Sequence, residues 1–244
     1  MRLPILFPDD IMPDYQQIYR TQAKEYELLV SYEDCQQKIL PALEQIRPLA
    51  GLEVVEFGAG TGRLTCLVAP FAKTIRAFDA SAQMLGVTVA KLQTSGRRNW
   101  LAAVAEHSHL PVASGTADLC IAGWTFGHFS SWYPETWRRE IAKVLREIER
   151  VLRLGGSAII LETLGTGQQT PQPPTEALAA YYAWLEGEHS FSSTWIRTDF
   201  CFDSLSKAQR LMRFFFDKPM TAAMLVSKEH VILPECTGIW WREY

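Results

Sequence analysis

Two hydrophobic periods alternate along this chain. Short runs of adjacent apolar residues, typical of strands buried on both faces of a sheet, occupy residues 52–57, 74–78, 100–104, 117–122 and 157–161. Apolar residues three and four apart, typical of amphipathic helices, lie between these runs at 64–71, 81–92 and 134–152. This alternation predicts an α/β fold with a mostly parallel sheet and helices on both of its faces.

The helix predicted from Pro134 has the clearest pattern. Its apolar residues fall on one side, and arginine and glutamate residues fall on the opposite, solvated side. Proline suits the first turn of a helix, and the pair Gly155-Gly156 suits its end. We therefore expect this helix to pack on the sheet and to stop before the strand at 157–161.

Further elements are predicted at both ends of the chain. Two leading helices are expected over residues 14–30 and 32–46, before the first strand. Residues 165–174 contain glycine and proline without apolar periodicity, which predicts a surface loop near the ligand site. After this loop we expect helices at 176–188 and 204–216 and strands at 195–202 and 238–241.

The composition is that of an ordinary globular protein. Of the 244 residues, 48% are hydrophobic and 21% are charged, which provides enough apolar surface for a folded core. The formal net charge of -3 and the pI near 6.0 provide no basic field for sequence-independent binding to nucleic acid. A local basic patch is still compatible with this charge.

The five cysteines are scattered along the chain without a Cys-x-x-Cys pair. We therefore expect small buried thiols in a reducing cytoplasm. Residues 1–10 contain an apolar run broken by two prolines, which is too short for a signal peptide, and no run reaches the length of a membrane span. The chain is expected to be a soluble cytoplasmic protein.

The first predicted strand ends in a glycine-rich turn, Gly58-Ala59-Gly60-Thr61-Gly62. Glycine adopts positive φ without strain and lets a ligand approach the backbone. The dinucleotide fingerprint has its third glycine three positions after the second. Here Gly62 follows Gly60 by two positions and Arg63 stands at the fingerprint position, so the spacing disfavours a nicotinamide dinucleotide.

Three acidic residues lie at the carboxyl ends of the first three predicted strands: Glu56, Asp79 and Glu106. Parallel strands end at one edge of the sheet, so these side chains are expected around one crevice. Asp79 lies nineteen residues after Gly60, where a carboxylate can accept both hydroxyls of a ribose. Three carboxylates suit a ligand with an ammonium and a sulfonium group and would repel a pyrophosphate.

With these motifs the chain resembles the class I S-adenosylmethionine-dependent methyltransferases over nearly its whole length. The resemblance rests on Val54–Leu64 for the glycine motif, Phe78–Leu85 for the ribose motif and Ala105–Pro111 for the adenine motif. It implies a Rossmann-like, doubly wound, mostly parallel seven-stranded sheet with an antiparallel last strand, in which 195–202 pairs with 238–242. It also implies S-adenosylmethionine as the cofactor and in-line methyl transfer to an acceptor, which we expect to be a small molecule.

The resemblance gives each motif a role. Glu56 and the loop backbone would hold the methionine part of the cofactor, and Asp79 would hold the ribose. Met84 would pack on the adenine, while Glu106, where relatives more often have aspartate, and the backbone of His107 would contact its amino edge. The cofactor-binding residues that follow are Tyr26, Glu56, Gly58, Ala59, Gly60, Thr61, Gly62, Asp79, Ala80, Met84, Glu106, His107, Gly123 and Trp124.

His128 is the candidate catalytic base. The methyl group of a sulfonium is already activated, so the protein mainly aligns and desolvates the reactants, and a base is needed only when the acceptor must lose a proton. Residues 121–129 resemble the exit of the fourth strand, which would place this imidazole at the mouth of the crevice. A packing or substrate-orienting histidine is the alternative. His107 and His109 have no metal-ligand spacing, so no metal is predicted.

Two groups of aromatic residues have open interpretations. Tyr15, Tyr19 and Tyr26 fall on one helical face and would either close over the cofactor or pack in the core. The runs 214–216 and 240–241 would either line an aromatic acceptor pocket or lie between core and surface.

We expect a single methyltransferase domain over residues 1–244. Residues 1–50 would form a cap of amino-terminal helices, and 165–190 would be a lid that completes the acceptor pocket. The partner expected is a small-molecule acceptor, with neither membrane nor nucleic acid. A non-catalytic cofactor-binding protein of the same fold is the main alternative, because the motifs specify the donor and not the acceptor. A nicotinamide oxidoreductase and a nucleic-acid or protein methyltransferase are less favoured.

Overall fold

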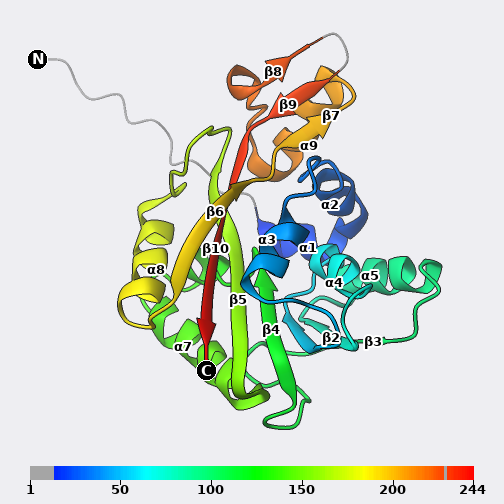
Figure 1. The fold of residues 1–244 in the computed structure, drawn as a ribbon. Helices are drawn as coiled ribbons and strands as arrows, with labels where there is room; N and C mark the ends of the chain where they lie inside the picture. The colour runs from blue at the N-terminus through cyan, green and yellow to red at the C-terminus, as the bar shows by residue number, and fades with distance from the viewer. Residues whose placement is uncertain (1–13, 228–229) are drawn as a thin grey trace, which may run out of the picture.

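A seven-stranded sheet forms the centre of the computed structural model, which describes residues 14–227 and 230–244 (Figure 1). Its strands are β1 (Glu53–Phe57), β2 (Thr74–Asp79), β3 (Trp100–Val104), β4 (Ala117–Gly123), β5 (Leu152–Thr166), β6 (Ser192–Arg197) and β10 (Glu235–Glu243). They lie in the order β3-β2-β1-β4-β5-β10-β6, with β10 antiparallel to both β5 and β6. The strands β1 to β5 are parallel. The predicted doubly wound, mostly parallel sheet is confirmed.

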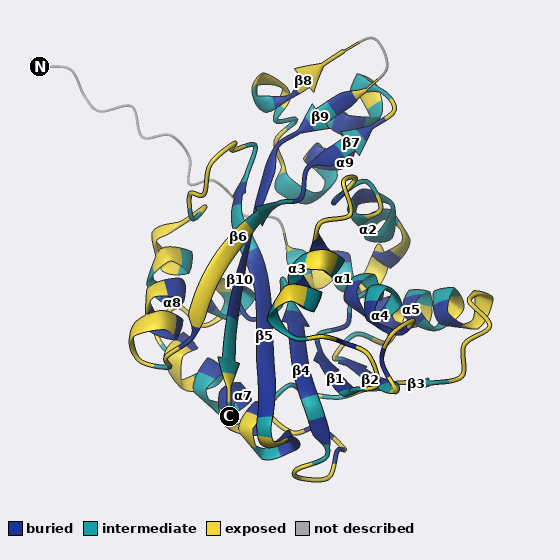
Figure 2. Cartoon of the chain, viewed as in Figure 1, coloured by how far each residue is buried: buried dark blue, intermediate teal, exposed yellow. Residues whose placement is uncertain are grey.

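Helices cover both faces of this sheet. One face carries α3 (Ile39–Ile46), α4 (Arg63–Val68) and α5 (Ala82–Thr94), and the other carries α7 (Trp137–Val151) and α8 (Glu176–Gly187). Figure 2 shows β1 and β4 buried between these layers, whereas β6 at the sheet edge is exposed. Each face has its own apolar cluster, so the core lies in two layers with the sheet between them.

A small second sheet, which the sequence did not predict, lies beyond the carboxyl ends of the parallel strands (Figure 1). It consists of β7 (Phe200–Phe202), β9 (Val231–Leu233) and β8 (Leu225–Val226) in that order. A third apolar cluster joins it to α9 (Leu205–Phe216), to the short helix η1 (Thr221–Ala223) and to α2 (Ala23–Val30). This sheet and its helices cover the edge of the central sheet at which the ligand site was predicted.

The single strand predicted over residues 195–202 is wrong, because the chain changes sheets at Thr198 and Asp199. The backbone N–H of Thr198 donates to the carbonyl of Glu235 at 3.0 Å, and Asp199 Oδ1 accepts from the Glu235 N–H at 3.0 Å. These bonds hold residues 198–199 to the start of β10 before the chain enters β7. Only β6 therefore forms the predicted antiparallel pair with β10.

The leading helices are shorter than predicted. The first prediction is interrupted at Gln22, which has φ -128° and separates α1 (Tyr15–Thr21) from α2. The second is wrong before Ile39, because Asp34 and Gln37 have positive φ. The Asp34 carboxylate accepts from the backbone N–H groups of Lys38 and Ile39 at 2.7 and 3.1 Å, which fixes the start of α3. Residues 1–10, considered above as a signal segment, lie outside the described residues.

Two further boundaries around the long helix differ from the prediction. A short helix, α6 (His128–Trp132), precedes it and was not predicted, and α7 begins at Trp137 instead of Pro134. Gly155-Gly156 lies inside β5 and does not end the helix. The Gly155 N–H donates to the Tyr244 carbonyl at 2.6 Å, and the Tyr244 N–H donates to the Gly156 carbonyl at 2.9 Å. Tertiary pairing with the end of β10 thus places these glycines in a strand.

The expectation of five free thiols is wrong for one pair. Cys35 and Cys201 form a disulfide with their Cα atoms 5.9 Å apart. Backbone bonds from Cys35 to Asp199 and from Cys201 to Tyr32 hold the two segments together, although 166 residues separate the cysteines in sequence. No local sequence pattern predicts a disulfide between cysteines so far apart in the chain. The other cysteines, Cys66, Cys120 and Cys236, are free. None of the described helices is long and apolar enough to cross a membrane.

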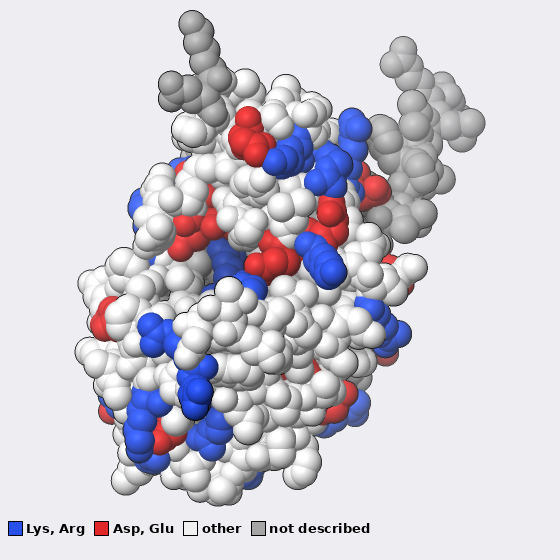
Figure 3. Space-filling view, turned by 90° about the vertical axis from the view of Figure 1, so that its right-hand side faces the viewer, with Lys and Arg blue, Asp and Glu red and all other residues white. Residues whose placement is uncertain are grey.

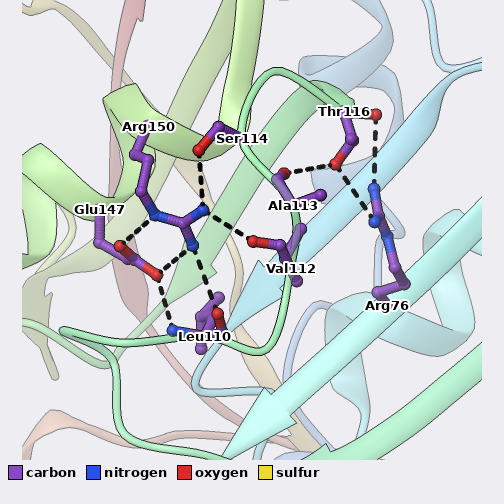
Figure 4. Close-up of polar contacts among 8 residues, drawn as sticks. All are labelled: Arg76, Leu110, Val112, Ala113, Ser114, Thr116, Glu147 and Arg150. Carbon is purple, nitrogen blue, oxygen red and sulfur yellow. Dashed lines mark hydrogen bonds and ion pairs between the residues drawn. The ribbon is translucent and has the colours of Figure 1, made fainter.

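Arg150 on α7 holds the connection between β3 and β4 (Figure 4). Its guanidinium donates to both carboxylate oxygens of Glu147, at 2.8 and 2.6 Å, and to the carbonyls of Val112 and Leu110, at 2.7 and 3.3 Å. Glu147 Oε1 also accepts from the Leu110 N–H at 2.6 Å. This network fastens the 110–116 segment to the helix.

We predict that Arg150→Ala lowers the free energy of unfolding by about 1–3 kcal/mol, because it leaves the buried Glu147 carboxylate without its charged partner. Urea denaturation measures this loss. Arg146→Ala is the matched control, since Arg146 is exposed on the same helix and has no partner in the described part of the chain. The control should change stability by less than about 0.5 kcal/mol. Equal effects of the two substitutions would contradict the role of the network.

The stability that Arg150→Ala loses should decrease as the pH falls. Hydrogen bonding from Arg150 lowers the pKa of Glu147 in the folded protein. Such a carboxyl contributes stability above its unfolded pKa of about 4.3 and loses that contribution as the pH falls through the lower folded pKa. The difference in the free energy of unfolding between wild type and Arg150→Ala should therefore be constant near neutral pH and become smaller in acid.

Candidate functional site

The glycine turn after β1 needs glycine for both conformation and space. Gly58, Gly60 and Gly62 have φ of +70°, +55° and +81°, a region that side chains disfavour. A Cβ atom on Gly58 would lie 2.3 Å from Thr125 Oγ1, and one on Gly62 would lie 2.8 Å from Thr88 Cγ2. Gly62 then begins α4. The loop backbone is thus held tightly between β1 and the neighbouring elements.

Asp79, at the end of β2, holds this loop in place. Its Oδ2 accepts from the Gly60 N–H at 2.8 Å, and its Oδ1 accepts from the Ser81 N–H at 2.7 Å. Burial raises the pKa of Asp79, and the two N–H bonds oppose that rise. Ala80, between Asp79 and Ser81, is exposed. The predicted ribose acid therefore lies directly beside the glycine loop.

Glu56 is more enclosed than the sequence indicated. Its side chain is buried at the end of β1, and Thr65 Oγ1 on α4 donates to its Oε2 at 2.5 Å. Burial raises its pKa to about 8. The neighbouring Thr61 has a buried hydroxyl with no hydrogen-bond partner in the described residues, and the buried Ala59 completes the turn.

The residues of the third motif lie at the same edge. The Ala105 N–H donates to the Asp79 carbonyl at 3.1 Å, so Glu106 follows β3 next to the ribose motif, where it is exposed. His107 Nδ1 is buried without a partner, and burial lowers the pKa of this imidazole to about 4. Met84, in the first turn of α5, has its methyl carbon 3.6 Å from the Cβ position of Gly60. We call residues 56–62, 79–84 and 106–107 the motif cradle.

A cavity of about 590 Å³ opens next to the motif cradle. Its wall comes from α1, α2, α6, α9, the ends of β5 and β10, and the segment 165–175. Among the predicted site residues, Tyr26, Trp124 and His128 line it, whereas the loop glycines and the acids Glu56, Asp79 and Glu106 do not. The site therefore has two parts, the motif cradle and the cavity.

Trp124 lies where β4 leaves the sheet, between these two parts. It has a φ of +51°, and its N–H donates to the Leu161 carbonyl at 2.7 Å. The Arg63 guanidinium carbon lies 3.9 Å from the centre of its ring. The preceding Gly123 lies against Leu64, which a Cβ atom would approach to 2.7 Å.

Aromatic rings from the amino-terminal helices, α6 and α9 form one side of the cavity, which we call the aromatic wall: Tyr15, Tyr19, Tyr26, His128 and Phe215. The ring centres of Tyr19 and Tyr26 are 5.4 Å apart, and Phe215 lies 5.0 Å from Tyr15 and 5.3 Å from Tyr26. The Tyr19 carbonyl accepts from Ser81 Oγ at 2.8 Å. The wall is therefore attached to the motif cradle.

The second aromatic run of the sequence, Trp240–Trp241, does not line the cavity. Trp240 is buried in the core, with its ring centre 4.4 Å from that of Tyr182. It belongs to the apolar layer under α8.

His128 is partly buried within the aromatic wall. The Tyr19 hydroxyl and His128 Nε2 are 2.9 Å apart, and the Trp132 ring stacks on the imidazole at 4.9 Å. Burial lowers the pKa of His128 to about 4. The imidazole is therefore neutral near pH 7 and can both accept and donate one hydrogen bond.

Sequence reasoning missed Glu162, which lines the cavity near the end of β5. Its Oε1 accepts from the Gly127 N–H at 2.8 Å, just before His128. Burial raises its pKa to about 8, against the opposing hydrogen bonds of the 125–127 backbone. An acid after the apolar run 157–161 follows the same rule that identified Glu56 and Asp79, so the signal was present in the sequence.

Five more charged residues of the cavity were not predicted as site residues: Glu33, Arg63, Asp217, Lys218 and Glu235. They come from remote parts of the chain and no motif connects them. Among the described residues, no group of three or more histidine, cysteine or acidic side chains is arranged to hold a metal ion.

Comparisons with known proteins identify the fold. Residues 55–160 match the family model of the methyltransferase domain. No curated protein sequence matches the chain. Three solved structures share the fold. An S-adenosylmethionine-dependent methyltransferase from Aquifex aeolicus is 16% identical, with 90% of this chain and 96% of that chain covered and a TM-score of 0.54. The YcgJ protein from Bacillus subtilis is 14% identical, with 85% and 99% covered and a TM-score of 0.58.

The third structure is phosphoethanolamine N-methyltransferase 2 from Haemonchus contortus, in complex with phosphomonomethylethanolamine and S-adenosylhomocysteine. It is 15% identical, with 93% of this chain and 59% of that chain covered and a TM-score of 0.59. The family match runs from inside β1 to inside β5, so it includes the glycine loop and stops two residues before Glu162.

Proposed function

Because this chain belongs to the class I S-adenosylmethionine-dependent methyltransferases, we propose that it methylates a small molecule bound in the cavity beside the motif cradle. The cavity volume of about 590 Å³ carries this proposal, since it lies in the range of small-molecule sites. A polymer would need an open groove. The face in Figure 3 has basic and acidic side chains interspersed, and the net charge is -3, which does not favour nucleic acid.

We propose that the motif cradle holds S-adenosylmethionine. The bound cofactor would supply a methyl group activated by a positively charged sulfur. Asp79 would accept from the ribose hydroxyls, Glu56 and the backbone of residues 58–62 would contact the methionine part, and Met84, Glu106 and His107 would surround the adenine. Two features of the chain support this fit: positive φ at the three loop glycines and the unpartnered buried hydroxyl of Thr61. Ala80, Gly123, Trp124 and Tyr26 would complete the contacts.

Two segments would close the acceptor side. The segment 165–190 contributes several residues to the cavity, from Gly165 to Leu178, which supports its role as a lid. The amino-terminal helices, described from residue 14, contribute Tyr15, Tyr19 and Tyr26 and would act as a cap. The whole chain would then work as one methyltransferase domain.

His128 would position the acceptor and receive a hydrogen bond or a proton from it. Its neutral imidazole and its contact with the Tyr19 hydroxyl at 2.9 Å would define one direction of approach. In-line transfer depends strongly on such alignment.

We predict that Asp79→Ala weakens S-adenosylmethionine binding by about 1.5–3 kcal/mol, because the ribose loses a charged hydrogen-bond acceptor and the Gly60 N–H loses its partner. Isothermal titration calorimetry measures the change. Asp118→Ala is the control, because Asp118 also accepts a backbone N–H, that of Glu53, but lies at the opposite end of the sheet. Unchanged affinity in Asp79→Ala, or an equal loss in the control, would refute the ribose assignment.

We predict that His128→Ala lowers kcat about a hundredfold or more and leaves cofactor affinity within a factor of about two. A screen of small molecules with isotope-labelled S-adenosylmethionine identifies the acceptor, and steady-state kinetics with it give kcat. The exposed His109, outside the cavity, provides the control variant His109→Ala. A wild-type rate in His128→Ala would exclude His128 from the reaction.

A further inference from the structure

One end of the cavity is polar, and we call its three residues Glu33, Arg63 and Glu235 the polar corner. Arg63 Nη1 donates to Glu33 Oε2 at 2.7 Å, and these side chains are 16% and 7% exposed. Glu235 is 2% exposed, and its Oε1 accepts from Thr163 Oγ1 at 2.7 Å. All three residues line the cavity. The polar corner therefore faces any ligand bound there while it is shielded from bulk water.

Two atoms of the polar corner lack partners. Glu235 Oε2 and Arg63 Nη2 are buried and have no hydrogen bond to any described residue. Thr166 faces Glu235 across the β5–β10 ladder, and its hydroxyl opposes the rise in the pKa of the Glu235 carboxyl. Buried polar atoms in proteins are almost always paired. One free acceptor beside one free donor thus points to a ligand that supplies both missing partners.

The charges of the polar corner are unequal. Two buried carboxyl groups share one guanidinium, and Glu235 forms no ion pair within the described residues. Burial, followed by repulsion from Glu33, raises the pKa of Glu235 to about 8, so without a ligand this carboxyl is mostly protonated near pH 7. Asp217 and Lys218, which also line the cavity, bring one charge of each sign and leave this balance unchanged. A positively charged ligand group beside Glu235 would lower the pKa of its carboxyl and so stabilise the carboxylate that accepts from the ligand.

The aromatic wall adds a second feature that suits a cation. The faces and edges of Tyr15, Tyr19, Tyr26 and Phe215 lie within contact of one another in the same cavity. Aromatic faces attract ammonium groups through their quadrupoles, and most strongly where water is excluded.

We propose that the acceptor is an amine with a neighbouring oxygen, whose ammonium donates to Glu235 Oε2 and whose oxygen accepts from Arg63 Nη2. A nitrogen that takes the methyl group must first lose a proton, which the Glu235 carboxylate would accept. This proposal rests on the proposed function, because it names the class of molecule that occupies the acceptor cavity. A neutral alcohol lacks the charge that would stabilise the Glu235 carboxylate, and a carboxylate ligand would add a third carboxyl group beside the single guanidinium of Arg63.

Calorimetric titrations of the full chain, saturated with S-adenosylhomocysteine, test this proposal with four matched probes: 2-amino-1-phenylethanol, 2-phenylethylamine, 2-phenylethanol and phenylacetate. We expect both amines to bind about tenfold or more tightly than the alcohol and the acid. 2-Amino-1-phenylethanol should bind more tightly than 2-phenylethylamine, because only the former offers an oxygen to Arg63. Equal binding of amine and alcohol, preference for phenylacetate, or no gain from the added hydroxyl would overturn the assignment.

Substitutions of Glu235 test whether this residue causes the preference for amines over the alcohol. In Glu235→Gln the amines should lose their advantage over the alcohol, and in Glu235→Asp, which keeps the charge, part of the advantage should return. Glu149→Gln is the control, since Glu149 is exposed on α7 and outside the cavity. A preference for amines that survives Glu235→Gln would overturn the proposal. Failure of the wild type to bind S-adenosylhomocysteine would instead refute the proposed function.

Discussion

The Asp79 carboxylate is the interaction on which the site depends. By accepting the N–H groups of Gly60 and Ser81 it joins the end of β2 to the glycine loop and to the start of α5. Ser81 in turn bonds to the Tyr19 carbonyl, so the aromatic wall is attached at the same place. The partly buried Asp79 carboxylate therefore joins two segments of the motif cradle, and the neighbouring Ser81 joins the cradle to the cavity wall. The Asp79 oxygens are held by backbone groups, which fixes their direction before any ligand arrives.

Buried acids are concentrated at the carboxyl edge of the sheet. Glu56, Glu162 and Glu235 each have a pKa raised to about 8 by burial. Burying carboxyl groups costs free energy, and such groups cluster where binding or chemistry uses them. These three acids lie on strands of the central sheet, at the edge where the parallel strands end, and not on a separate loop.

Local patterns predicted the central sheet, the helices that cover it and the motif cradle, because each depends on residues close in sequence. The same rule for acids at strand ends would also have identified Glu162. The polar corner was not predictable, since Glu33, Arg63 and Glu235 meet only in the folded chain. The Cys35–Cys201 pair and the break at residues 198–199 likewise depend on contacts between distant segments. Tertiary pairing decided these features, and a single sequence carries no signal for it.

The central claim is that the motif cradle and the cavity are the donor and acceptor halves of one site. A crystal structure of the chain with S-adenosylhomocysteine tests it most directly. We expect the ribose on Asp79 and the sulfur directed into the cavity, toward the aromatic wall and His128. A ligand bound elsewhere, or a sulfur directed away from the cavity, would contradict it.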